Sequence, residues 1–124
     1  MTDERLYTVD EADAVLPGLR ERLIRIREAR QVILRQAKIV REKVVAEVGG
    51  ADPGPAYREA SATLRAELER LSAENILLRD PETGLVDFPA EREGTRVYLC
   101  WRLGEDRVAS WHAVDAGFAG RRPL

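Results

Sequence analysis

The feature that most restricts the fold is a long amphipathic segment that starts near residue 16. Apolar residues recur along it at the heptad spacing of a helix that buries one stripe. One position of the repeat holds Leu16, Leu23, Ala37 and Val44, and the other holds Leu19, Ile26, Ile33 and Val40. The pattern predicts a single long helix, which at about 1.5 Å per residue would span roughly 48 Å.

The start of this helical region, residues 8–48, carries two local signals. Thr8 and Glu11 have the spacing of a capping box, in which each side chain bonds the backbone amide of the other residue. Pro17 lacks a backbone donor, and its ring clashes with the preceding turn. We therefore expect a capped helix with a kink or break at Pro17.

A turn and a second amphipathic segment follow. Gly49-Gly50 is expected to end the first helix, and Asp52-Pro53-Gly54-Pro55 is expected to form the turn. Residues 55–79 repeat the helical spacing, so a link this short predicts an antiparallel helical hairpin of the coiled-coil type. Arg30 and Asn75 interrupt the two apolar seams, as polar residues that fix register do.

After Gly84 the apolar period changes from that of a helix to that of a strand. Short alternating runs predict a three-stranded antiparallel β-meander over residues 85–114. Its first strand is expected to be short, from Leu85 to Phe88, because Pro89 follows, and a tight hairpin turn is expected at residues 104–106. Residues 115–124 form an aperiodic tail. A sheet this small needs a surface to cover it. We expect a single α+β domain over residues 1–124, with the sheet on a spare apolar stripe of the first helix: Val32, Ile39 and Ala46.

The composition narrows the class of protein. Apolar residues make up 44% and charged residues 34% of the 124, and no apolar run approaches the roughly 20 residues of a membrane span. The acidic start lacks a secretory leader, which favours a cytoplasmic protein that does not associate with membranes. With one cysteine and one histidine, a zinc site within one chain would need carboxylates as well.

Several strings of the chain resemble a known family. They are the start Tyr7-Thr8-Val9-Asp10-Glu11-Ala12 with Leu16-Pro17, and then Gly84 to Ala90, Leu99 to Glu105, Trp111-His112 and Gly117 to Arg121. Together they are similar to a prokaryotic family catalogued only as domain of unknown function 2203. The resemblance covers nearly the whole chain and implies no activity, cofactor or substrate.

His112 is the leading candidate for chemistry, because histidine alone changes charge near neutral pH without perturbation. Asp87, Asp115 or Glu74 could join it in an acid–base pair or in a carboxylate-rich site for a divalent metal. In the metal alternative the ligands are His112, Asp87 and Glu74. The plainer interpretation is a strand histidine bonded to a local carboxylate, and the sequence favours it.

Four further residues have both a structural and a functional interpretation. Cys100 is expected to be a small buried residue rather than a nucleophile. Trp101 and Trp111 are expected to flank each other across two strands, with a stacking platform for a planar ligand as the alternative. Arg121 either grips an anionic ligand or docks the tail on a second subunit.

The stretch from Arg20 to Lys43 holds nine basic residues against Glu21, Glu28 and Glu42. It suits phosphate contacts, but the calculated pI of 5.5 and the lack of a known nucleic-acid module disfavour that role. We expect these arginines to form a solvated face that pairs with those three glutamates.

These observations favour a non-enzymatic interaction or assembly module that works as a homodimer. The apolar surface of two amphipathic helices exceeds what a small sheet can cover, and no catalytic motif is present. The alternative is a small metal- or ligand-binding protein with a site around His112. Nucleic-acid binding through the basic helix comes third.

Overall fold

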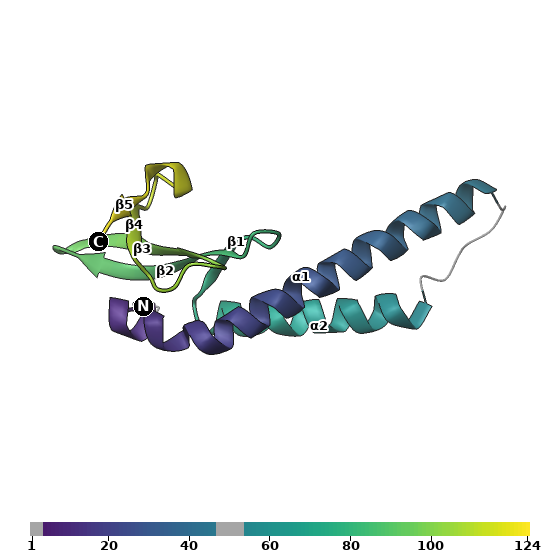
Figure 1. Cartoon of the computed structure of the whole chain (residues 1–124), viewed down its shortest axis with the longest axis horizontal. Coiled ribbons are helices and arrows are strands. Elements are labelled where there is room, and N and C mark those ends of the chain that lie inside the picture. The colour runs from purple at the N-terminus through teal and green to yellow at the C-terminus, as the bar shows by residue number, and fades with distance from the viewer. Residues whose placement is uncertain (1–3, 47–53) are drawn as a thin grey trace.

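The computed structural model describes residues 4–46 and 54–124, which form two helices and a five-stranded antiparallel sheet (Figure 1). The helices are α1 (Val9–Ala46) and α2 (Gly54–Ala73). The strands are β1 (Leu77–Asp80), β2 (Leu85–Arg92), β3 (Thr95–Arg102), β4 (Ser110–Ala113) and β5 (Arg122–Pro123), with a short 3-10 helix η1 (Phe118–Gly120) before β5. Gly49-Gly50 and Asp52-Pro53, expected at the turn, lie outside the described residues.

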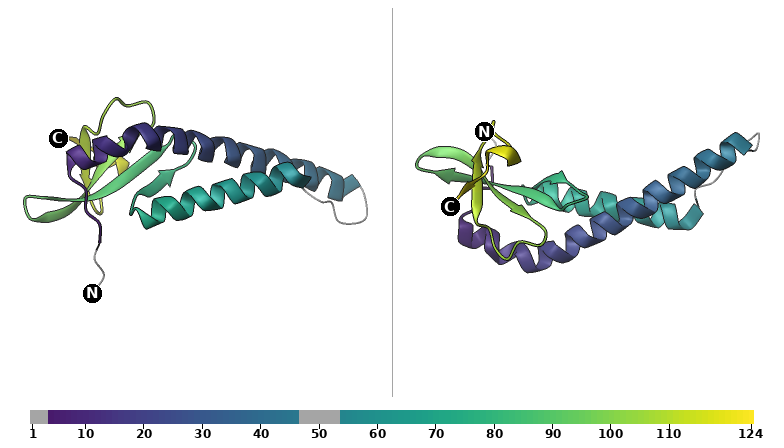
Figure 2. Two further views of the ribbon diagram at one scale, coloured as in Figure 1. Left: turned by 90° about the horizontal axis from the view of Figure 1, so that it is seen from below. Right: turned by 45° about the horizontal axis from the view of Figure 1, so that its top comes forward.

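The first helix is continuous, so the expected break at Pro17 does not occur. The helix runs through Pro17, and its axis curves along the N-terminal part (Figure 2). A proline removes one hydrogen bond and bends a helix, while the packing of the flanking turns keeps it intact. The capping box is confirmed: Thr8 N donates to Glu11 Oε1 at 2.9 Å, and Glu11 N donates to Thr8 Oγ1 at 3.1 Å.

The second helix ends at Ala73, and the prediction that it continues to residue 79 is wrong. Asn75 has a φ of 58°, in the left-handed region that ends helices, and the Ile76 amide bonds back to the Leu71 carbonyl at 3.0 Å. The Asn75 side chain donates to the Arg5 carbonyl at 3.0 Å. Asn75 is therefore a helix stop rather than a seam residue, and the chain beyond it is free to form β1.

The sheet has five strands rather than three, in the spatial order β1-β2-β3-β4-β5. Leu77 and Leu78 read as helical in the sequence but pair with Asp87 and Val86 of β2. The tail, expected to be aperiodic, contains η1 and β5, and Arg122 pairs with Trp111. Two short edge strands thus lie outside the expected meander.

The central hairpin is longer than predicted. Pro89 lies within β2, where the missing N–H is tolerated because β1 pairs with β2 only as far as Asp87. The β2–β3 turn is Glu93-Gly94, where both residues have positive φ, as a two-residue hairpin requires. The link expected to be tight at residues 104–106 instead extends from residue 103 to residue 109.

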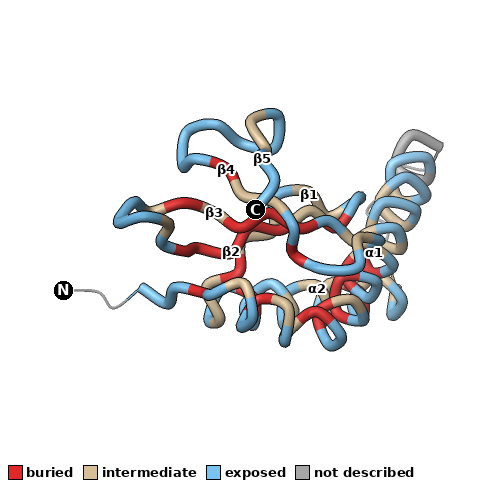
Figure 3. Tube along the Cα trace, turned by 60° about the vertical axis from the view of Figure 1, so that its left-hand side comes forward, coloured by how far each residue is buried: buried red, intermediate tan, exposed pale blue. Residues whose placement is uncertain are grey.

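One face of the sheet and the N-terminal part of α1 form the hydrophobic core. Along β2 and β3 alternate residues point to this face: Val86, Phe88, Ala90, Val97, Leu99 and Trp101. The helix contributes Ala12, Leu16, Leu19, Leu23 and Ile26. Figure 3 shows the buried residues gathered in this region. The sheet therefore packs on the apolar seam of α1 that contains Leu16, Leu19 and Leu23. It does not pack on the spare stripe, in which Ile39 is 42% exposed.

The helical hairpin extends away from this core (Figures 1 and 2). No residue between positions 30 and 42 of α1 is buried, and in α2 only Ala60 and Leu71 are. Among the described residues, several basic side chains of α1 pair with carboxylates outside this helix, whereas the expectation was pairing with glutamates on the same helix. Arg22 and Arg25 bond Glu67 of α2, and Arg30 bonds Glu82 at 2.9 Å.

Candidate functional site

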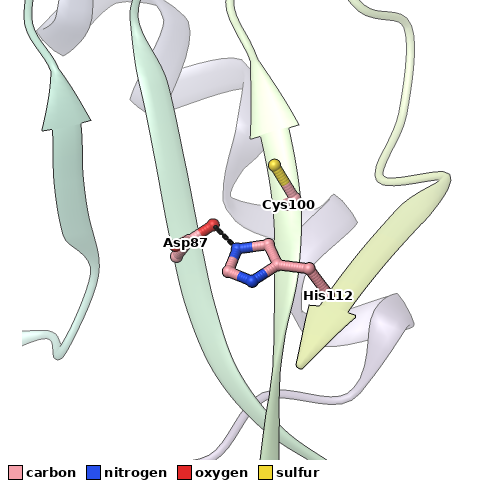
Figure 4. A group of neighbouring side chains, drawn as sticks. All are labelled: Asp87, Cys100 and His112. Carbon is pink, nitrogen blue, oxygen red and sulfur yellow. Dashed lines mark hydrogen bonds and ion pairs between the residues drawn. The ribbon is translucent and has the colours of Figure 1, made fainter. Parts of the chain in front are cut away.

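Three chemically active side chains converge on the sheet face that points away from α1. Asp87 on β2 lies opposite Cys100 on β3, and His112 on β4 lies opposite Tyr98 on β3. Side chains alternate between the faces of a strand, so all of these point to the same side. Figure 4 shows the Asp87 carboxylate and the His112 imidazole reaching toward each other across β3, with the Cys100 sulfur beside them.

His112 is 2% exposed, and both of its ring nitrogens face acceptors. Nδ1 lies 2.8 Å from the Ala113 carbonyl oxygen, and Nε2 lies 2.9 Å from Asp87 Oδ1. A neutral imidazole has one donor nitrogen and one acceptor nitrogen. In a neutral His112 ring, the nitrogen without a proton would therefore point its lone pair at the lone pair of an acceptor oxygen. This geometry calls for a second proton or a metal ion on the ring.

Asp87 is held as a carboxylate by a cation on its other side. Arg79 Nε donates to Asp87 Oδ2 at 2.9 Å, while the Asp87 side chain is 3% exposed. The Asp87 hydrogen bond is the main cause that raises the pKa of the Arg79 guanidinium. An ionised carboxylate can only accept, so Asp87 provides no proton for the contact with Nε2.

Cys100 completes the cluster as a neutral thiol. It is 1% exposed, which confirms the expected burial. Burial, together with the nearby Asp87 carboxylate, raises the pKa of the Cys100 thiol to about 12. Since the thiolate is the reactive form, Cys100 does not fit the role of a nucleophile in this state. A cation nearby is what would stabilise its thiolate.

One ligand atom from each of Asp87, Cys100 and His112 lies within 4.8 Å of the others. Zinc bonds of about 2.0–2.3 Å place tetrahedral ligand atoms roughly 3.3–3.8 Å apart. The carboxylate and imidazole would separate slightly around an ion, and the sulfur would approach by about an ångström. Arg79 on Asp87 and the Ala113 carbonyl on His112 would orient two of the ligands, as groups behind metal ligands do.

An open pocket of about 480 Å³ adjoins this cluster. Asp87 and His112 belong to its lining, whereas Cys100 does not. The segment after β4 forms another wall, through Val114, Asp115 and Phe118. The cluster of Asp87, Cys100 and His112 is therefore buried against the strands that carry it, and its other side borders a cavity.

The structure brings some of the predicted site residues together and separates others. Asp87 and His112 are in direct contact, and Asp115 lies on the wall of the same pocket. Glu74 is elsewhere: its carboxylate accepts from Arg22 Nη1 at 2.7 Å, between the two helices. Glu74 therefore does not join the proposed metal ligands.

The two tryptophans do not form the expected cross-strand pair. Trp101 lies opposite Val86 and is fully buried, whereas Trp111 lies opposite Leu99, two residues away from Trp101 along β3. A buried Trp101 cannot stack on a ligand. Trp111 is half-buried, with the guanidinium groups of Arg92 and Arg122 over its ring at 4.8 Å and 5.7 Å.

The Arg121 side chain bonds another residue of this chain and does not line the pocket. Its Nη2 donates to Glu105 Oε2 at 2.6 Å, and its guanidinium lies 5.0 Å from the Phe118 ring centre. Arg121 therefore anchors the tail to the β3–β4 link.

Sequence reasoning missed Arg79 and did not place Cys100 beside Asp87 and His112. Arg79 was placed at the end of a helix, so nothing connected it to Asp87. The signal for Cys100 was its facing opposite to Leu99 and Trp101, which set it on the side of β3 that points away from those two residues. The pairing of Asp87 with Cys100 needed the strand register, which the sequence alone did not provide.

Comparisons with known proteins identify the chain by family. Neither α1 nor α2, over the residues described, is apolar enough to cross a membrane. No curated protein and no solved structure matches the chain. The family model for "Uncharacterized conserved protein (DUF2203)" matches residues 5–124. A match over nearly the full length shows that the chain belongs to the DUF2203 family.

Proposed function

We propose that this protein binds a divalent transition metal of the zinc type through Asp87, Cys100 and His112. The observation that carries the proposal is the environment of His112, whose two ring nitrogens both face acceptors in a buried setting. A metal on Nε2 satisfies that nitrogen and the Asp87 oxygen together. It also gives the neighbouring sulfur a partner that favours its thiolate form.

The ligand set supports a zinc-type ion over magnesium or calcium. Magnesium and calcium prefer oxygen ligands, whereas imidazole and thiolate suit zinc and its neighbours in the first transition row. Three protein ligands leave a fourth tetrahedral position, and zinc sites that act on small molecules keep such a position open. The pocket beside Asp87 and His112 offers that position a path to solvent.

The arrangement is less suited to metal-free acid–base catalysis. A general base needs a nitrogen within reach of the substrate. In His112 one nitrogen is engaged by Ala113 and the other by Asp87, and the ring is 2% exposed.

The test is metal binding by the full chain, purified without a histidine tag and stripped with a chelator. We expect one Zn²⁺ per chain by elemental analysis after dialysis. Co²⁺ should bind at the same site and give a thiolate-to-metal charge-transfer absorption, which arises only when Cys100 is a ligand. Variants Cys100→Ser and His112→Ala should abolish that absorption and weaken Zn²⁺ binding at least tenfold.

Asp115→Asn is the matched control, because Asp115 lies on the same pocket but outside the ligand set. It should bind Zn²⁺ as the wild type does. Circular dichroism of each apo variant separates loss of ligation from loss of fold. Folded wild-type protein that takes up no Zn²⁺ or Co²⁺ would overturn the proposal.

A second proposal concerns assembly. We propose that the helical hairpin pairs with that of a second copy of the chain, forming a homodimer. Leu34 is 50% exposed and Leu68 is 40% exposed, and an apolar hollow of about 350 Å³ lies beside Leu68, with Ile33, Tyr57 and Leu64 in its lining. Two helices side by side offer a face about 20 Å wide, and some 30 Å of its length gives roughly 600 Å², the lower end of the range of about 600–1,000 Å² per partner of a standard interface.

Light scattering coupled to size exclusion tests this assembly. We expect a mass of twice the 14.0 kDa of the chain. Leu34→Glu should reduce that mass to that of the monomer, because it places a charge in an apolar interface. The control is Val114→Glu, which alters a 53% exposed apolar residue just after β4, away from the helical hairpin, and should leave the dimer intact. A monomeric wild type at tens of micromolar would contradict the proposal.

A further inference from the structure

We infer that the pocket beside Asp87 and His112 of the proposed metal site binds a small organic oxyanion. This ligand would have one carboxylate or phosphate head and an apolar body. This inference rests on the proposed metal site. The head would occupy the open metal position and the exposed donors of Arg79, while the body would lie against the wall formed by Leu85, Val114 and Phe118.

Arg79 is fixed on two sides and still accessible. Its Nε bonds Asp87, and its guanidinium lies 5.0 Å from the centre of the Tyr98 ring. Its side chain is 43% exposed although the Asp87 carboxylate beneath it is 3% exposed. A guanidinium has five donors in a planar fork, which matches the two oxygens of a carboxylate or phosphate. Arg79 is thus positioned in advance, with donors left over for a ligand.

The pocket supports a ligand that also has an apolar part. Its volume of about 480 Å³ lies in the range of small-molecule sites, about 300–1,000 Å³. Val114 and Phe118 line it and are 53% and 41% exposed, respectively. Large apolar side chains beside a few polar groups are typical of small-molecule sites. An aryl or short alkyl group would cover these two side chains.

The charges around the pocket favour one anionic group over two. Arg79 and the bound metal ion attract an anion near Asp87. Asp115 on another wall is a carboxylate that would repel a second negative group on the same ligand. The ligand class is therefore a monoanion with an apolar body rather than a dicarboxylate.

Co²⁺-loaded protein allows a direct test with phenylacetate as the probe. At saturating Co²⁺, phenylacetate should shift the visible absorption of the metal in a saturable manner. Arg79→Gln should weaken this binding by about ten- to a hundredfold, because it removes a charge-assisted hydrogen bond. Succinate should bind less tightly than phenylacetate, and Asp115→Asn should reduce that preference.

Arg96→Gln is the matched control. Arg96 stacks on the same Tyr98 ring at 4.6 Å but lies outside the pocket lining, so its loss should leave phenylacetate binding unchanged. Failure of Co²⁺ to bind would remove the metal site itself. If Co²⁺ binds with its thiolate absorption but phenylacetate leaves the spectrum unchanged, or if Arg79→Gln binds phenylacetate as the wild type does, the oxyanion inference alone is overturned.

Discussion

The two nitrogens of the buried His112 ring have neighbours of the same kind. A neutral imidazole has one donor nitrogen and one acceptor nitrogen, and matches one neighbour of each kind. Here both neighbours accept, and the one on Nε2 is a carboxylate that is itself held by Arg79. The positive charge that this arrangement needs is the physical basis of the proposed metal site.

The Cys100 thiol should be inert in the folded metal-free protein. Its pKa is raised to about 12 by burial and by the Asp87 carboxylate, and its side chain is 1% exposed. At about pH 8 the thiolate fraction is therefore very small. We expect a thiol reagent to modify Cys100 at least a hundredfold more slowly in native protein than in denaturant, as followed by mass spectrometry. Equal rates in the two states would show that the sulfur is accessible.

The capping box gives the helix start a defined pH dependence. The backbone and side-chain hydrogen bonds of Thr8 lower the pKa of Glu11 from its ordinary value of 4.5. A lowered folded-state pKa means that the stabilisation is present above 4.5 and is lost as the pH falls through the folded value. The melting temperature of Glu11→Ala should therefore lie below that of the wild type at neutral pH, and the difference should shrink in acid. A constant difference would contradict the ionic contribution.

At the scale of elements, the contact of α1 with α2 depends on a buried arginine. Arg22 is 6% exposed, and it bonds Glu67 at 3.1 Å and Glu74 at 2.7 Å. Arg22→Ala leaves these two carboxylates without their buried cation. A broken buried ion pair costs about 3–5 kcal/mol, so we expect a loss of that size in the free energy of unfolding.

Arg25 provides the control for this prediction. It bonds the same Glu67 at 3.4 Å, but its side chain is 47% exposed. An exposed pair contributes less than about 1 kcal/mol, so Arg25→Ala should have a small effect in the same urea titration. Similar losses for the two variants would mean that burial does not set the strength of the Arg22 pairs.

The sequence predicted the helices well because their signal is periodic and local. The heptad spacing and the capping box located α1, and alternation located β3. The prediction failed where contacts between residues far apart in the sequence determine which element forms. Leu77 and Leu78 continue a helical spacing, yet Asn75 ends the helix and β2 provides a pairing partner. Pro89 was expected to end the first strand. The strand continues through Pro89 because β1 stops pairing with β2 at Asp87, so no partner there needs the missing N–H of the proline.

The candidate site was partly visible in the sequence. Asp87 and His112 were considered together because both lie on strands, but their contact depends on β3 lying between them. Arg79 could not be included, because its strand was read as helix. Glu74 was included as a carboxylate of the predicted helical hairpin, but its side chain accepts a hydrogen bond from Arg22 of α1 instead.

At the scale of the whole molecule, burial is uneven along α1. Residues 12–26 include six buried residues, namely Ala12, Leu16, Leu19, Arg22, Leu23 and Ile26, whereas residues 30–42 include none. Local opening costs less where few apolar contacts are lost. In dilute protein, hydrogen exchange should be much faster for amides of residues 33–42 than for those of residues 16–26.

The same experiment reports on assembly. If hairpins pair between two copies, protection of residues 33–42 should increase with protein concentration, while that of residues 16–26 stays constant. Uniform protection along α1 in the monomer would contradict the uneven burial.

The alternation along β3 ties the interior of the protein to its candidate site. Val97, Leu99 and Trp101 fill the interior, while Tyr98 and Cys100 face the site from the residues between them. A slip of one residue in strand pairing would exchange these two sets, exposing the tryptophan and hiding the sulfur. The cluster can therefore assemble only in a chain whose strands are correctly aligned, so metal uptake would report on the completion of folding.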